Sequence, residues 1–290
     1  MTAATALDAE PLFEIVSDEQ QGEHRFLRIV PKDPAGLASD LAPRITQPYF
    51  DEEAARERIV RAARELEIFS GEDLSAEDPR IDAIVAEERD AVLPAAWKGE
   101  RPKQLDVQRS EFGEIVAAEV LSSLFGTRIP ASRIAHKETP DQQARGADVM
   151  GIEDGQAQLL LILTEVKGST DSTTPPGVIA DMEKKLKSLV EDRRALLQEL
   201  IWLRDYSSDE HAAECAKVCA SFQLNRPIFG LLMAPVLIRT ASKEGGSDAG
   251  RFRDSPDEFG CPVRFVSVVV EPDLFELASQ VYGLAREAAA

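Results

Sequence analysis

Three ionisable residues, two carboxylates and a lysine, lie close to a stretch whose composition predicts a buried β-strand. Leu159–Leu163 is apolar at every position, which is typical of a strand covered on both faces. Glu165 and Lys167 follow it directly, and Asp148 stands upstream. Charge at the end of a buried strand is costly unless it is paired or used in chemistry. We therefore expect Asp148, Glu165 and Lys167 to form a functional site.

The strand pairing decides whether these groups meet. The two predicted strands and the loop between them are Gly146–Glu153, Gln158–Lys167 and Asp154–Ala157. Side chains alternate along a strand, so Glu165 and Lys167 share one face and Val166 points to the other. A four-residue loop pairs Asp148 with Leu163, diagonal to Glu165 on the same face. A loop longer by one residue would move Asp148 to the opposite face.

A further carboxylate lies on the amphipathic helix predicted for Gln108–Gly126. The same-face neighbours of Glu114 are Ala117, Ala118, Leu121 and Leu124, all apolar. A carboxylate in a core-facing stripe either pairs with a cation, here Arg109 or Arg128, or points at a functional site. We expect the second. Glu111 and Glu119 rank lower because their neighbours are more polar.

This pattern resembles the PD-(D/E)XK nuclease superfamily. The residues that carry the resemblance are Gly146-Ala147-Asp148 and Glu165-Val166-Lys167-Gly168. Alanine stands before Asp148 where the motif has proline. The resemblance implies a restriction-endonuclease-like α/β core, a mixed sheet flanked by helices, over roughly residues 108–271. It also implies that the Asp and Glu bind a divalent metal and that the Lys orients or activates the attacking water.

The residue types suit that chemistry. Mg²⁺ is typically held by one or two carboxylates together with substrate phosphate, so Asp148 and Glu165 are the expected ligands of Mg²⁺ (or Mn²⁺). Glu114 and the carbonyl of Val166 are further candidate ligands. Lys167 would contact the attacking water or stabilise transition-state charge. The alternative is that Lys167 only forms an ion pair with Glu165 at the sheet edge.

A finer resemblance is to HamA (anti-bacteriophage protein A), the effector family of the Hachiman anti-phage system. The residues that match are Gly113-Glu114, Gly146-Ala147-Asp148 and Glu165-Val166-Lys167. The resemblance implies a DNA-cleaving effector restrained by a helicase partner. Two alternatives remain: a stand-alone restriction or repair endonuclease, and a catalytically inert interaction subunit with the same fold.

The composition of the chain bears on its location and on how it could bind nucleic acid. The chain has 290 residues, 43% of them hydrophobic, and a formal net charge of −19. No apolar run approaches the ~20 residues of a membrane span, and no signal peptide is visible. Three cysteines are too few for a disulfide framework, which favours a cytoplasmic protein. The acidic balance is unusual for a protein that binds nucleic acid unaided.

The acidic excess is concentrated at the N-terminus, where residues 1–100 hold 23 acidic and 11 basic residues, a net of −12. We expect residues 1–100 to form an acidic α+β module that docks a partner, and residues 101–290 to form the nuclease-like domain. Leu93–Leu105, rich in proline and charge, is the expected linker. A local basic groove serving the site is the alternative explanation.

The remaining pattern predicts further elements. Strands are expected at Ile129–His136, Ile228–Ile238 and Val263–Val270, and helices at Val178–Tyr206, Asp209–Ser221 and Pro272–Ala288. The basic face of Val178–Tyr206 is either solvated or a phosphate-tracking surface. Arg239–Asp257 is expected to be a flexible loop able to touch nucleic acid through Arg239, Lys243, Arg251 and Arg253.

A rival metal site consists of His211, Cys215 and Cys219, spaced four apart on one helix face, with Cys261 available elsewhere. Three thiols and an imidazole could bind Zn²⁺. Small buried cysteines on an apolar helix face are commoner, and we prefer that interpretation.

Overall fold

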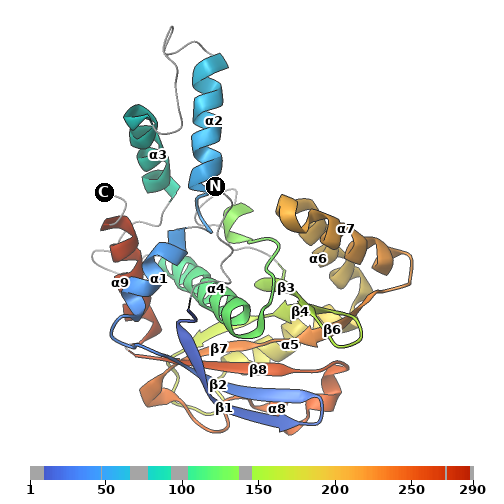
Figure 1. Cartoon of the computed structure of the whole chain (residues 1–290). Coiled ribbons are helices and arrows are strands. Elements are labelled where there is room, and N and C mark those ends of the chain that lie inside the picture. The colour runs from blue at the N-terminus through green and yellow to red at the C-terminus, as the bar shows by residue number, and fades with distance from the viewer. Residues whose placement is uncertain are drawn as a thin grey trace.

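Helices cover both faces of a mixed β-structure in this computed structural model (Figure 1). The structure describes residues 10–46, 48–65, 78–92, 104–136, 146–271 and 273–287. The strands are β1 (Phe13–Gln21), β2 (His24–Pro31), β3 (Val149–Asp154), β4 (Leu159–Thr164), β5 (Val166–Ser169), β6 (Phe229–Met233), β7 (Val236–Thr240) and β8 (Arg264–Val270). They form a five-stranded sheet in the order β1-β2-β8-β7-β5 and a three-stranded sheet in the order β3-β4-β6. The predicted α/β class is confirmed.

The helices divide between the two faces of the sheets. They are α1 (Leu37–Thr46), α2 (Glu52–Glu65), α3 (Pro79–Val92), α4 (Gln104–Phe125), α5 (Val178–Glu191), α6 (Arg193–Tyr206), α7 (Asp209–Gln223), α8 (Arg251–Asp254) and α9 (Leu274–Glu287). One core cluster joins α1, α4 and α9 to the sheet, and another joins α5, α6 and α7 to its opposite face. Strand alternation explains the division, because Val236 and Ile238 enter the first cluster and Leu237 enters the second.

The two sheets meet where two chain segments pass from one to the other. β4 pairs in parallel with β6, and β5 pairs in parallel with β7, so Glu165 and Ala234-Pro235 stand at the same level between the sheets. The Val236 N–H donates to the Glu165 carbonyl at 3.0 Å. The single strand predicted for Ile228–Ile238 is therefore wrong. It is broken at Pro235, which has no N–H to continue a ladder.

Two other predicted elements also differ. Ile129–His136 is not a strand: only Arg128 bridges to Ile152, the Pro130 carbonyl accepts the Ser208 N–H, and Ile134–His136 is a 3₁₀ turn. The helix predicted for Val178–Tyr206 is two helices. Asp192 adopts extended backbone (φ −94°, ψ 101°), and its carboxylate accepts the N–H groups of Arg194 and Ala195, so it caps α6.

The N-terminal strands belong to the main sheet. β2 pairs in parallel with β8, and Phe13, Leu27 and Ile29 lie in the same core cluster as α4 and α9. Whether residues 1–100 fold independently of residues 101–290 stays a prediction. In the structure, β1 and β2 belong to the same sheet and core as the predicted nuclease-like domain. Of the proposed linker Leu93–Leu105, residues 93–103 lie outside the described ranges, and α4 begins at Gln104.

The paired helices α2 and α3 form a smaller cluster of their own, centred on Val60, Ala63, Ile81 and Val85 (Figure 1). Glu87 and Glu88 are exposed on α3, as expected for a solvated acidic face. Within the described ranges, none of the helices combines the length and apolar composition that a membrane span requires.

Candidate active site

The register of the β3–β4 hairpin brings Asp148 and Glu165 together. Val149 pairs with Thr164 and Asp154 with Leu159, so the register is displaced by two residues from the predicted one. A displacement of two keeps every side chain on its face. The ladder ends at Val149, and the Asp148 N–H donates to the Thr164 carbonyl at 3.0 Å, so Asp148 lies beside the end of β4 where Glu165 follows. The loop is residues 155–158, one position later than predicted, closed by a hydrogen bond from the Gly155 N–H to the Gln158 carbonyl.

Asp148 is tied to the motif strand through the backbone. The Val166 N–H donates to Asp148 Oδ2 at 2.8 Å. Because Val236 pairs with the Glu165 carbonyl, strand alternation turns the peptide groups of Val166 away from β7 and toward Asp148. The Val166 carbonyl therefore lies on the Asp148 side of β5, as the predicted ligand role requires.

Glu165 is almost completely buried, with a side chain 1% exposed, and two lysines pair with it. Lys167 Nζ lies 2.5 Å from Glu165 Oε1, so the ion pair named as the alternative role of Lys167 is present. Burial, reinforced by repulsion from Asp148, raises the pKa of Glu165 to about 7, although Lys185 and Lys167 oppose the rise.

Lys185 on α5 is the residue that sequence reasoning missed. Its Nζ lies 2.9 Å from Asp148 Oδ1 and also forms an ion pair with Glu165 Oε2. Burial opposes its charge, but the attraction of Asp148 and Glu165 outweighs burial and raises the pKa of Lys185. The basic face of this helix was predicted as a whole, with nothing to single out Lys185. The available signal was helical spacing. Lys185 lies three residues after Met182 and directly before Leu186, which places it at the edge of the core-facing stripe that also contains Leu189.

Glu114 approaches the same charges from α4. Among the described residues it makes no hydrogen bond or salt bridge, and Arg128 pairs instead with Asp154 and Glu214. The side chain of Arg109, the other partner considered, lies outside the described residues. Burial and then repulsion from Asp148 raise the pKa of Glu114 to about 8, with Lys185 partly opposing them. Glu114 therefore shares the electrostatic environment of the pair at the sheet junction.

Gly113 explains how α4 comes so near to β5. A Cβ built on Gly113 would lie 3.3 Å from Val166 Cγ1 and 3.6 Å from Ile238 Cδ1. The missing side chain lets the helix lie close to the motif strand and carries Glu114 with it. The pair Gly113-Glu114 thus has a packing role as well as a charged one.

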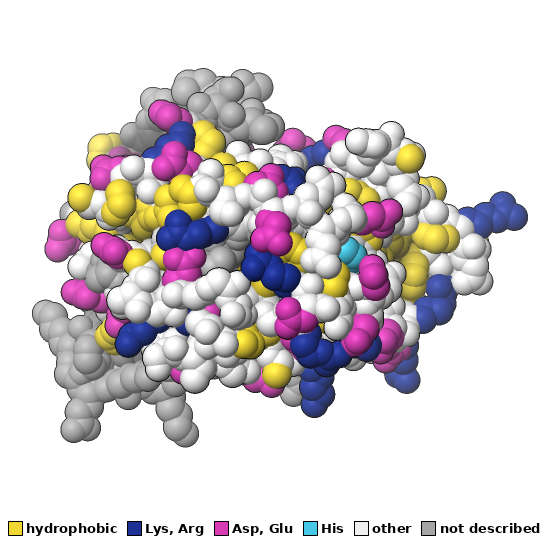
Figure 2. Space-filling model, turned by 90° about the horizontal axis from the view of Figure 1, so that it is seen from below, with side chains coloured by type: hydrophobic (Ala, Val, Ile, Leu, Met, Phe, Trp, Pro, Cys, Tyr) yellow, Lys and Arg dark blue, Asp and Glu magenta, His cyan; other side chains and the backbone are white. Residues whose placement is uncertain are grey.

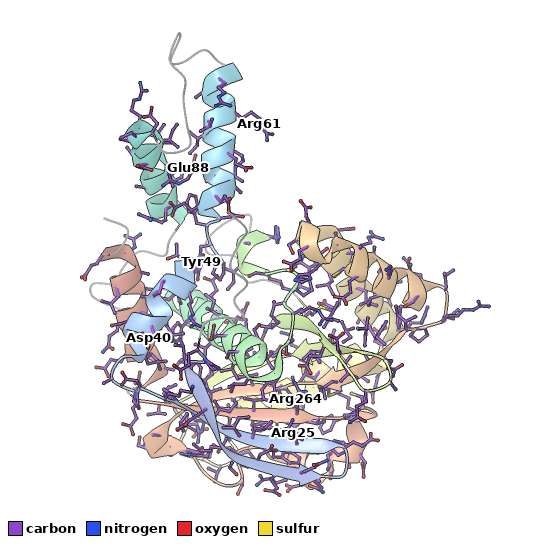
Figure 3. All side chains as sticks on the ribbon, viewed as in Figure 1. Arg25, Asp40, Tyr49, Arg61, Glu88 and Arg264 are labelled. Carbon is purple, nitrogen blue, oxygen red and sulfur yellow. The ribbon has the colours of Figure 1, made fainter. Side chains whose placement is uncertain are left out.

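Two other carboxylates of α4, Glu111 and Glu119, have structural partners. Glu111, ranked lower from the sequence, is more deeply buried (3% exposed) and accepts the hydroxyl of Tyr49 at 2.5 Å. Tyr49 in turn lies 2.8 Å, hydroxyl to hydroxyl, from Tyr282 on α9; Figure 3 labels Tyr49 near the foot of α2. Glu119 pairs with Arg44 of α1. These contacts fasten the N-terminal segment and α9 to the helix that carries Glu114.

A buried ion pair supports the loop before Asp148. Arg133 Nη2 lies 2.5 Å from Glu199 Oε2, the Arg133 Nε–H donates to the Ala147 carbonyl, and the Ala147 N–H donates to Glu199 Oε2 at 3.1 Å. Gly146 has φ +103°, and a Cβ there would lie 2.3 Å from Glu199 Oε1. Proline at position 147 could not donate this hydrogen bond, so the alanine that departs from the motif has a specific local function.

The predicted contacts of the segment Arg239–Asp257 with nucleic acid are wrong for its first arginine. Arg239 is fully buried, pairs with Asp248 at 3.0 Å, and donates to backbone carbonyls that include Asp171 at 2.7 Å. Arg251 and Arg253 pair with acidic side chains, Glu258 and Glu19. The segment is not an open loop, because it contains 3₁₀ turns and α8. Lys243 is exposed, and its proposed contact stays a prediction.

The cysteines behave as the preferred interpretation expected. Cys215 and Cys219 are buried in the α5–α7 core cluster, and Cys261 packs against it. Among the described residues, no group of three or more His, Cys, Asp or Glu is arranged to hold a metal ion. That finding applies equally to Asp148, Glu165 and Glu114, which do not converge as a three-carboxylate cage. Two carboxylates that share one cation still match the sparse ligand set of Mg²⁺.

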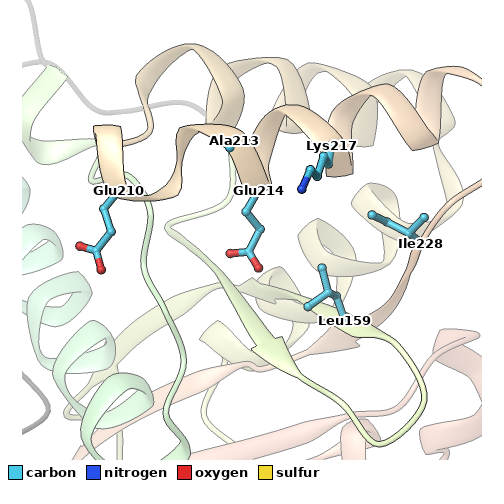
Figure 4. A pocket seen from close by; sticks show the side chains of 6 residues that line it. All are labelled: Leu159, Glu210, Ala213, Glu214, Lys217 and Ile228. Carbon is cyan, nitrogen blue, oxygen red and sulfur yellow. The ribbon is translucent and has the colours of Figure 1, made fainter.

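Charge on the surface is mixed. Figure 2 shows basic and acidic side chains interspersed over the underside of the molecule as it is drawn in Figure 1. The ion pairs of β2 include Arg25–Asp18 and Arg28–Glu244. A pocket elsewhere lies between α7 and the N-terminal end of β4 (Figure 4), and none of the site carboxylates lines it. It is lined by Leu159, Glu210, Ala213, Glu214, Lys217 and Ile228.

Comparison with known proteins supplies a family. The family model for HamA matches residues 11–226, about three-quarters of the chain, and this range contains β1, β2 and every residue of the candidate site. A search of curated proteins found no match. The matched length and the residues that it contains agree with the resemblance carried by the three short motifs. The chain therefore belongs to the HamA family, that of the Hachiman anti-phage proteins.

Proposed function

We propose that this HamA family protein is a metal-dependent deoxyribonuclease with a PD-(D/E)XK-like core, whose site is formed by Asp148, Glu165 and Lys167. The observation that supports it best is that Asp148 Oδ1 and Glu165 Oε2 both contact one positive charge, the ammonium of Lys185, at the junction of two sheets. A second lysine lies 2.5 Å from the other oxygen of Glu165. A buried carboxylate with two lysines and a second carboxylate beside it, as Glu165 has, is more often functional than structural.

Each side chain has a distinct role in this proposal. Asp148 and Glu165 hold Mg²⁺ or Mn²⁺, with the Val166 carbonyl as a further ligand and Glu114 as an outer carboxylate. When bound, the ion supplies Lewis acidity that activates water and neutralises phosphate charge. Lys167 orients the attacking water or stabilises the developing negative charge. The hydrogen bond from the Val166 N–H keeps Asp148 in place for the ion.

Plasmid nicking tests the chemistry. The wild type should cleave with Mg²⁺ or Mn²⁺ and stop on addition of EDTA, and parallel DNA and RNA substrates define the nucleic acid. Lys167→Met should reduce cleavage on the order of a hundredfold or more, because the group acting on water is lost. Calorimetry should show metal binding retained by Lys167→Met and lost by Asp148→Asn.

Lys184, exposed on α5, provides the matched control, because Lys184→Met removes one positive charge without touching either carboxylate. Wild-type rates in Lys167→Met would refute this site assignment. Metal-independent cleavage would refute the chemistry.

We further propose that a helicase partner regulates the protein. The acidic N-terminal segment and the net charge of −19 support this, because strong negative charge disfavours unaided binding to DNA. The helix pair α2–α3, with its own small core and exposed Glu87 and Glu88, is the proposed docking surface; Figure 3 labels Glu88 on α3.

Deletion of residues 1–100 would remove two sheet strands, so charge reversal is the sharper test of docking. Glu87→Lys with Glu88→Lys should weaken co-purification with the helicase and leave the melting temperature unchanged. Full partner binding by this variant would exclude the α3 face. Cleavage by the wild type alone, at the rate of the complex, would favour a stand-alone endonuclease.

A further inference from the structure

The carboxylate oxygens of the site divide into two kinds. Asp148 Oδ2 accepts the Val166 N–H, and Glu165 Oε1 pairs with Lys167. The two remaining oxygens, Asp148 Oδ1 and Glu165 Oε2, both contact the ammonium of Lys185. The oxygens left for a shared metal are thus the ones that Lys185 already joins.

Lys185 is placed so that it can leave this position. Glu165 is 1% exposed, whereas the Lys185 side chain is 35% exposed, so the ammonium reaches the pair from a partly solvated position at the edge of the core-facing stripe of α5. A four-carbon flexible stem allows the head group to move by several ångströms without moving the helix. Met182, Leu186 and Leu189 anchor the helix in the core. The side chain, not the helix, is the movable part.

Without a cation between them, the two carboxylates would repel each other in a poorly solvated junction. We infer that Lys185 is an internal counter-cation that competes with the divalent metal for Asp148 Oδ1 and Glu165 Oε2, and so sets the metal affinity of the site. This inference rests on the proposed function. It assigns Lys185 a role distinct from that of Lys167, whose partner is the other oxygen of Glu165.

Two opposite effects of one substitution follow. Lys185→Met should bind Mn²⁺ about tenfold more tightly than the wild type by calorimetry, because a competing positive charge a few ångströms away is removed. In EDTA the same variant should melt at a lower temperature than the wild type, because the carboxylates lose their counter-charge. Added Mn²⁺ should raise its melting temperature more than that of the wild type.

The controls separate charge from general disruption. Lys185→Arg keeps the charge and should retain weak Mn²⁺ binding, and Lys184→Met should match the wild type in both measurements. If Lys185→Met does not fold, Lys185→Gln carries the same expectations, because it is neutral but still polar. Asp148→Asn should abolish Mn²⁺ binding in either background.

The outcomes distinguish this inference from the function on which it rests. Equal or weaker Mn²⁺ binding by the neutral variants, with normal binding by the wild type, would overturn the role of Lys185 and leave the nuclease proposal intact. An unchanged melting temperature in EDTA would also overturn it. Mn²⁺ binding by neither protein would overturn the metal site and the proposed function together. Binding only after Lys185 is neutralised would support competition most directly.

Discussion

Glu114→Gln should change how the stability of the protein depends on pH. Burial and the nearby Asp148 raise the pKa of Glu114 from 4.5 to about 8. A carboxyl group whose pKa is higher in the folded state stabilises the fold fully below pH 4.5. Its contribution is lost as pH rises toward about 8, because the unfolded chain ionises more readily. Glutamine has the same shape without the charge, so the variant should not show this loss.

The size of the effect can be bounded. A shift of 3.5 pKa units corresponds to a ceiling of about 5 kcal/mol at ~1.36 kcal/mol per unit. Glu114 is partly exposed, and solvent screening reduces such values substantially, so we expect about 1–2 kcal/mol. In a chain of this size, that corresponds to a rise in melting temperature of roughly 2–6 °C at pH 9 relative to the wild type. The two proteins should converge at pH 4.

Thermal unfolding followed by circular dichroism between pH 4 and pH 9, in EDTA, measures the difference. Glu88→Gln, which neutralises an exposed carboxylate on α3, is the control and should follow the wild type throughout. Parallel curves for wild type and Glu114→Gln would refute the reasoning, because they would mean that Glu114 is not held in a charge-unfavourable environment.

Two further predictions concern the groups that support the site. Ala147→Pro should destabilise the protein by about 1–3 kcal/mol in urea unfolding, because the N–H that donates to Glu199 is lost from a buried contact; Ala147→Ser, which keeps the N–H, should cost less. Arg239→Met should cost about 3–5 kcal/mol, because it leaves Asp248 buried without its cation. The exposed Lys243→Met is its control, and a loss no larger than the control's would contradict the structural role given to Arg239.

Short-range chemistry predicted much of the site. Alternation along a strand put Glu165 and Lys167 on one face without any knowledge of the fold. The hairpin register differed from the predicted one by two residues. Because an even displacement preserves faces, Asp148 still lies on the same face as Glu165. The charged position of Glu114 in an apolar helix stripe was also visible from spacing alone. These inferences needed only local geometry.

Breaks inside long apolar patterns were harder to find. The run Ile228–Ile238 is uniformly apolar, yet Pro235 and the passage between two sheets divide it into β6 and β7. Asp192 divides the predicted helix in the same way, by capping α6. Periodicity reports which face is buried, and it continues across a break when both halves face the same core.

The residues brought in from a distance depended wholly on tertiary structure. Lys185 is 37 positions from Asp148, and among several basic residues of α5 only the packing of that helix selects it. The same is true of Arg239, predicted to touch nucleic acid but buried because Asp248 and several carbonyls surround it. Sequence spacing by itself determined which carboxylates and which lysine could share a strand face, since alternation is a local property. The tertiary structure decided which cation lies between the carboxylates, because a side chain's partner depends on how distant elements pack.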